Sequence, residues 1–184
     1  MTCGNATIAV MFDEDFTQIC RTLPGGDGEP RVLFWGMERT RWIVVGTDFS
    51  EAADRALEHA VRLAAKSKAS LACVSAFEDP PAALASAVDP TPTLRAELAD
   101  AVARSGAESK GVHVELFVRR GPPWDKLLNV ASDLGADLIV VGAQGQRGAL
   151  HGFFLGSVAT RLAATSNRCV LVVPAHLDTE CGAS

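Results

Sequence analysis

Hydrophobic positions follow two alternating patterns between residues 42 and 173. Short strand-like runs, mostly apolar and in one case (112–118) alternating, are separated by longer segments in which an apolar side chain recurs every three or four positions. The strand-like runs cover residues 42–45, 70–77, 112–118, 137–141 and 169–173. Each run is followed by a helical segment or, for the last, by the end of the pattern. The sequence therefore predicts strands that alternate with helices.

The helical segments carry recognisable boundaries. Ser50 can cap a helix that extends to about residue 66, with an apolar face formed by Ala53, Ala56, Leu57, Ala60, Val61 and Ala64. Further helices are predicted around residues 94–105, 124–134 and 158–165, and Gly135 is placed to end the third. Five strands alternating with four helices predict an α/β fold, a mainly parallel sheet covered by helices on both faces.

Residues 1–40 differ from the rest of the chain. The segment 23–30 is dense in Gly and Pro, which is typical of a flexible linker. Residues 8–12 could form a strand, but no neighbouring pattern completes a unit. We therefore expect a flexible N-terminal extension over 1–40, a folded domain over 41–175 and a tail over 176–184. Three interpretations of the extension remain open: a disordered segment, a partner-binding arm, and the product of an incorrectly assigned start codon, with the last two favoured equally.

Composition narrows the functional classes. Apolar residues make up 48% and charged residues 21% of the 184 residues, as in soluble globular proteins. A net charge of -5 without a basic stripe argues against nucleic acid as the main partner. No apolar run is long enough to span a bilayer, and no secretion signal is visible, so a cytoplasmic protein is expected. The five cysteines lack the spacing of a zinc site, and no Ser/His/Asp set suggests itself.

The segment from Gly142 to Ser157 carries the strongest functional signal. It follows a buried strand, contains glycines at 142, 145, 148, 152 and 156, and leads into a helix whose first turn lacks Asp and Glu. Such an arrangement can present backbone N–H groups and the helix dipole to a phosphate. It is neither a Walker A motif nor G-x-G-x-x-G, so spacing alone favours a phosphate site and a plain loop equally.

A second loop, residues 46–50, follows the first strand and contains Thr47 and Asp48. In open parallel sheets the ligand crevice lies beyond the carboxyl ends of the strands, where the strand order reverses. Asp48 offers a carboxylate for ribose hydroxyls or Mg²⁺. The competing interpretation is a turn residue that bonds its own backbone.

These motifs, with the run at 169–173, resemble the ATP-binding branch of the universal stress protein family over about residues 41–174. The family pattern is G-x2-G-x9-G-(S/T), whereas residues 146–155 place ten positions between Gly145 and Gly156, one more than the pattern. The resemblance implies a Rossmann-like five-stranded sheet of order 3-2-1-4-5.

The resemblance also implies roles for individual residues. Asp48 corresponds to the aspartate near the ribose, and Ala76 to the position whose backbone contacts adenine. Gly142 and Gly145 correspond to glycines along the phosphates and ribose. Gly156, Ser157 and Val158 correspond to the start of the helix that holds the phosphate tail. ATP, with or without Mg²⁺, is the expected cofactor.

Three functions are compatible with these features: an ATP-binding stress sensor or regulator, a slow ATPase or autophosphorylating protein, and an interaction module that has lost nucleotide binding. We also expect a homodimer through strand 169–173, because the implied strand order leaves this uncharged apolar strand at the sheet edge.

Overall fold

The computed structural model describes residues 8–10, 19–24, 30–35, 42–78, 89–145 and 155–174. Five strands form the centre of the domain: β4 (Trp42–Gly46), β5 (Ser70–Phe77), β6 (Val114–Arg120), β7 (Leu138–Gly142) and β8 (Cys169–Val173). The helices are α1 (Glu51–Ser67), α2 (Thr91–Arg104), α3 (Pro123–Asp133) and α4 (Ser157–Thr165), with a short 3-10 helix, η2 (Glu108–Lys110). Among the described residues, no helix is both long and apolar enough to cross a membrane.

The five strands are parallel and lie in the order β6-β5-β4-β7-β8. Numbered along the domain, this is the predicted order 3-2-1-4-5, and the Rossmann-like α/β fold is confirmed. The chain leaves β4 in one direction for β5 and returns later on the other side of β4 as β7. The order therefore reverses between β4 and β7, and ligands of open α/β sheets commonly bind at the carboxyl ends of such strands.

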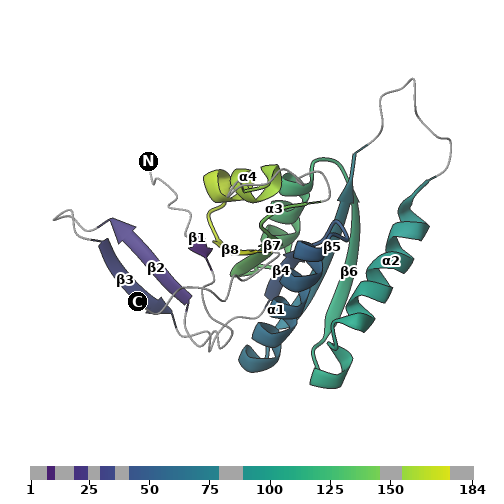
Figure 1. Ribbon diagram of the computed structural model, residues 1–184, viewed down its shortest axis with the longest axis horizontal. Coiled ribbons are helices and arrows are strands. Elements are labelled where there is room, and N and C mark those ends of the chain that lie inside the picture. The colour runs from purple at the N-terminus through teal and green to yellow at the C-terminus, as the bar shows by residue number, and fades with distance from the viewer. Residues whose placement is uncertain are drawn as a thin grey trace, which may run out of the picture.

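Alternating residues of the strands divide the core into two apolar layers. Val45, Cys73, Val140 and Leu171 pack beneath α1 and α2, whereas Val44, Val74, Ile139 and Val170 pack beneath α3 and α4. Figure 1 shows the sheet between these helix pairs. Because both faces are covered, the inner strands β4, β7 and β8 are apolar throughout, whereas the edge strand β6 also carries Glu115, Arg119 and Arg120.

Local signals in the sequence set the helix boundaries. Ser50 caps α1 as predicted, and its side chain accepts a hydrogen bond from Ala53 N. Gly135, with φ of 62°, follows the end of α3 in a left-handed conformation that favours glycine. The largest shift of a strand boundary concerns the strand expected at 112–118. Val112 N donates to Ala107 O in the turn after η2, so β6 begins at Val114 and extends to Arg120.

The N-terminal extension contains three strands: β1 (Ile8–Val10), β2 (Ile19–Pro24) and β3 (Pro30–Trp35). β2 and β3 form an antiparallel pair, which the sequence patterns did not predict. β1 pairs in parallel with β8, so the predicted strand near residue 8 has a partner after all. These strands lie at the end of the sheet opposite β6 and α2 (Figure 1).

The pairing of β1 corrects one expectation about the sheet edge. We expected residues 169–173 to form an unpaired edge strand, but β8 lies between β7 and β1 in a six-stranded sheet. The apolar pattern of β8 did identify an edge of the five-stranded domain. It could not show that a distant segment of the same chain occupies that edge.

Candidate functional site

The loop after β4 is shaped by its own side chains. Thr47 N extends the ladder by donating to Val74 O at 2.9 Å, while the Thr47 hydroxyl accepts a hydrogen bond from Phe49 N at 3.0 Å. Asp48 Oδ1 accepts one from Ser50 N at 3.1 Å. Phe49 has a positive φ of 62°, unusual for a residue with a bulky side chain. The two polar side chains therefore hold a tight turn that delivers the chain into α1.

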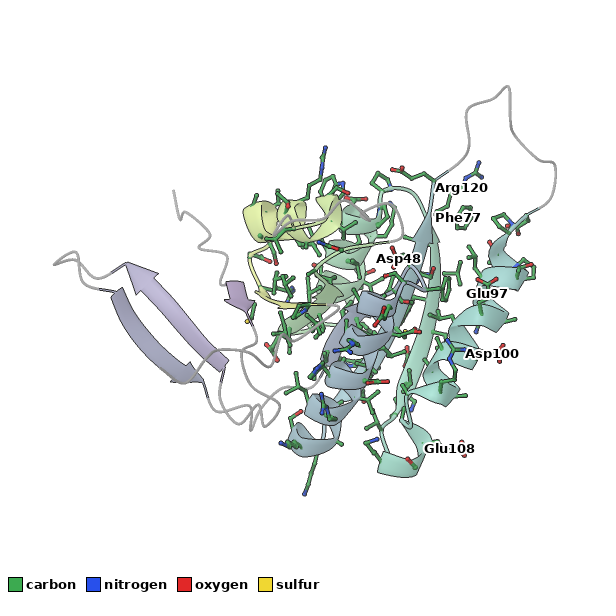
Figure 2. The ribbon with its side chains drawn as sticks, in the orientation of Figure 1. Asp48, Phe77, Glu97, Asp100, Glu108 and Arg120 are labelled. Atoms are coloured by element: carbon green, nitrogen blue, oxygen red, sulfur yellow. The ribbon has the colours of Figure 1, made fainter. Side chains whose placement is uncertain are left out.

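The predicted residues Thr47 and Asp48 occupy different environments. Thr47 is buried, with 7% of its surface exposed, and its hydroxyl is engaged in the turn. Asp48 is exposed at the end of β4. Figure 2 shows Asp48 at the same end of the sheet as Phe77 and Arg120, which belong to the carboxyl ends of β5 and β6. Asp48 is consequently the residue of this loop that is placed to meet a ligand.

Ser50 connects the loop after β4 with the loop after β7. Its hydroxyl accepts a hydrogen bond from Ala53 N at 3.3 Å and donates to Gln144 O at 3.5 Å. One hydroxyl therefore caps α1 and reaches across the reversal point of the sheet. The sequence predicted the cap but not the contact with Gln144, because a backbone carbonyl leaves no signature in the residue type.

Gly142 has a packing role that is independent of any ligand. A Cβ at this position would lie 2.8 Å from the carbonyl carbon of Ala52 and 2.9 Å from its Cβ. Real Cβ atoms do not approach other atoms this closely, so only glycine lets the end of β7 pass the first turn of α1. The structure thus explains Gly142 by helix-to-strand packing, beside the phosphate contact implied by the family resemblance.

Gly145 lies directly against Asp48. A Cβ added to Gly145 would overlap Asp48 Oδ2, and the overlapping atom belongs to a side chain rather than to backbone. The two loops predicted to flank the ligand therefore converge on this pair. Asp48 uses Oδ1 in its turn and directs Oδ2 toward the glycine loop.

The backbone of Ala143, at the start of the glycine loop, forms hydrogen bonds with both β8 and Gly156 at the end of the loop. Its N–H donates to Val173 O at 2.7 Å, and its carbonyl accepts from Gly156 N at 2.7 Å. A Cβ on Gly156 would lie 3.7 Å from Gly145 N. Gly145 and Gly156 are therefore neighbours, although ten residues separate them in the sequence. The extra residue of the loop does not spread these two glycines apart.

α4 begins at Ser157 after the N-cap residue Gly156, which provides no side-chain cap. The first turn contains no acidic residue, and Ser157 is exposed while Val158 is half-buried. The positive end of the helix dipole and its N–H groups lie where Gly156 contacts Ala143 and Gly145. This geometry suits an anion.

Ala76 marks the opposite end of the candidate site. It is half-buried near the end of β5, where it pairs with Arg119 of β6. Because Thr47 N bonds to Val74 O, β5 continues past the end of β4. Ala76 lies on this continuation of β5, near the turn that follows β4.

Parts of the prediction fall outside the described structure. The glycines at 148 and 152 belong to residues 146–154, which lie outside the described residues. In the part of the chain that the structure describes, no group of three or more His, Cys, Asp or Glu side chains could hold a metal ion. A single carboxylate such as Asp48 suits a Mg²⁺ that arrives with nucleotide phosphates, because such ions keep most of their ligands from water and phosphate.

Comparisons with known proteins agree with this architecture. Residues 40–174 match the model of the universal stress protein family. A universal stress protein from Bacillus subtilis, YxiE, is 39% identical over 71 residues, which span 39% of this chain and 47% of the relative. The chain thus matches about half the length of this curated relative.

Solved structures extend the likeness over most of the domain. A universal stress protein crystallised in complex with cAMP shares 33% identity and a TM-score of 0.56, with 74% of this chain and 98% of that chain covered. A family protein from Burkholderia pseudomallei shares 28% identity and a TM-score of 0.55, with 76% and 98% covered.

Proposed function

The chain belongs to the universal stress protein family, and we propose that it binds an adenine nucleotide, ATP, in the crevice between the loops after β4 and β7. The site comprises Thr47, Asp48, Ala76, Gly142, Gly145 and the start of α4 at Gly156, Ser157 and Val158. In this proposal the nucleotide spans from Ala76, beside the adenine, to Ser157, beside the phosphates.

The observation that carries the proposal is the closeness of Gly145 and Gly156. Their approach places the backbone of the glycine loop and the first turn of α4 around one position, as phosphate binding requires. The longer loop therefore remains compatible with nucleotide binding. The cAMP complex of the 33%-identical relative supports an adenine nucleotide as the ligand class.

Asp48 is proposed to bind the ribose hydroxyls or a nucleotide-bound Mg²⁺ through Oδ2. Its Oδ1 accepts a hydrogen bond from Ser50 N, which fixes the direction of the carboxylate before a ligand arrives. A preorganised acceptor loses little conformational entropy on binding. The turn role of Asp48 uses Oδ1, and the proposed ligand role uses Oδ2.

We infer a sensor or regulator rather than a catalyst. Asp48 is the one acidic or basic side chain in the segments 46–50, 76 and 142–145 of the proposed site. A general base and a phosphoryl acceptor would both have to come from outside these segments. The proposed function is accordingly a nucleotide-dependent role in the stress response, with a cytoplasmic location as predicted from the sequence.

Mass spectrometry of the purified, undialysed full-length protein tests the proposal. Co-purified ATP or another adenine nucleotide is the expected result, followed by titration calorimetry with ATP, AMP and cAMP after the ligand has been removed. Absence of binding to all three nucleotides would exclude the proposed site. Continuous phosphate release from ATP with Mg²⁺, absent from an Asp48→Asn control, would favour the slow ATPase instead.

A further inference from the structure

The side chains of β8 are fully used by the core of the domain. Cys169, Leu171 and Val173 pack in the layer under α1 and α2, while Val170 and Val172 pack in the layer under α3 and α4. All five residues are buried. Any strand that joins β8 must therefore recognise the N–H and C=O groups along its outer edge rather than its side chains.

β1 occupies that outer edge. Ile8 pairs with Val170, Ala9 with Leu171 and Val10 with Val172 in a parallel register. β1 lies outside residues 40–174, the part matched by the family model, so this strand is an addition to the family domain. Without it, β8 would be the last strand of the sheet and would present unpaired backbone groups.

We propose that β1 is an intramolecular cover for β8 that keeps a second copy of this chain from pairing with the same edge. A parallel strand from the chain's own N-terminus and an antiparallel β8 from another copy would require the same backbone groups, so the two arrangements exclude each other. The N-terminal extension then determines whether the protein is a monomer or a dimer.

The new edge that β1 creates is a poor template for further pairing. β1 has three residues, whereas β8 has five. The neighbouring segment β2 contacts β1 and is itself paired with β3 in a separate two-stranded sheet. Short edge strands and covering segments are common protections against edge-to-edge association. The extension therefore ends the sheet rather than moving its exposed edge outward.

The direct test disrupts β1 without altering the domain. The variant carries both Ile8→Pro and Ala9→Pro, and proline has no backbone N–H. In a strand, the N–H groups of alternate residues point to the same neighbouring strand, so one of any two consecutive residues donates to β8. The double variant therefore loses a donor to β8 in either case. Phe12→Pro with Thr17→Pro is the control, since it adds two prolines between β1 and β2 in the sequence. A charge at Val172 would be uninformative, because this side chain is 2% exposed and belongs to the core.

Sedimentation velocity of the full-length proteins, from about 1 to 100 µM, gives the first readout. The parent and the control should sediment as monomers of 19.3 kDa, and the β1 variant should dimerise at a concentration at least tenfold lower than either. Equal association of parent and β1 variant would overturn the proposal. A parent dimer that the prolines dissociate would also overturn it, because β1 would then be exchanged between copies.

Hydrogen exchange of the parent monomer gives an independent readout that requires no variant. The amides of residues 169–173 that point away from β7 should be protected, and this protection should be lost in the β1 variant at concentrations where it is monomeric. Rapid exchange of these amides in the parent would overturn the proposal even if the prolines prevented folding. Retained nucleotide affinity in the variant would show that its domain is intact.

Discussion

The Asp48 carboxylate and the Gly145 backbone pack so closely that no side chain at position 145 can coexist with the observed position of Oδ2. This pair joins the loop after β4 to the loop after β7 at the point where the strand order reverses. Because Gly145 has no side chain, it leaves room for the Asp48 carboxylate, which is the charged group of the proposed site.

Replacement of Asp48 separates its two roles. Asp48→Ala should weaken ATP binding by about tenfold or more, because a hydrogen bond to a charged acceptor contributes about 1.5–3 kcal/mol. Asp48→Asn keeps an oxygen for Ser50 N and should weaken binding with a smaller loss of stability. Titration calorimetry and urea unfolding measure the two effects. A Kd unchanged in both variants would assign Asp48 to the turn alone.

Gly145→Ala should weaken ATP binding by displacing Asp48 Oδ2. If the effect acts through that carboxylate, it should largely disappear when Gly145→Ala is introduced into Asp48→Ala, which a double-mutant cycle of Kd values measures. Additive losses would instead place the added methyl group in the ligand's own space. Ser157→Ala, at an exposed position that retains its backbone N–H, is a control for direct side-chain contact with phosphate.

Gly142→Ala should lower the free energy of unfolding by about 1–3 kcal/mol, as expected for overpacking. The nearest atom to the new Cβ would be the backbone carbonyl carbon of Ala52 at 2.8 Å. Ala52→Gly should therefore fail to restore stability in the double variant, since it removes a methyl group but leaves the backbone in place. Urea unfolding tests this, and full rescue by Ala52→Gly would contradict the packing explanation.

His59 should make stability sensitive to mild acid. Burial, with contributions from Arg62 and Arg55, lowers the pKa of His59 from 6.5 to about 4. An Arg62 guanidinium nitrogen lies 2.6 Å from His59 Nδ1, which favours the neutral ring. Between these pKa values the unfolded chain binds a proton that the folded chain does not, so His59 favours folding above pH 6.5 and loses this contribution as the pH falls toward 4.

The corresponding experiment compares the parent with His59→Gln by urea unfolding at pH 7.5 and pH 5. The parent should lose about 1–2 kcal/mol more than the variant over this interval, a value discounted for partial solvent access. An identical pH dependence of the two proteins would show that His59 does not carry the shift.

The sequence predicted the domain well because its signals are periodic. Both faces of the inner sheet are buried, so β4, β7 and β8 appear as continuous apolar runs, and Ser50 and Gly135 mark helix ends by their residue types. The sequence also singled out the loops after β4 and β7 by their Asp and Gly residues, and the structure brings these loops together at Asp48 and Gly145.

What the sequence did not reveal depends on backbone contacts between distant residues. Ala143 bonds to Val173 and Gly156 through its N–H and C=O, and any residue type could do the same. β1 joins β8 in the same way, so its partner could not be inferred from its three residues. The packing of Gly142 on Ala52 became visible only with α1 placed against β7.

The backbone character of the β1–β8 contact has a quantitative consequence for competition. Because hydrogen bonds to a strand edge discriminate little among sequences, the advantage of β1 over another strand rests on its covalent tether. Covalent linkage of two partners through a short linker gives an effective concentration on the order of millimolar. A second copy present at about 1 µM would therefore have to pair roughly a thousandfold more tightly, about 4 kcal/mol, to displace it.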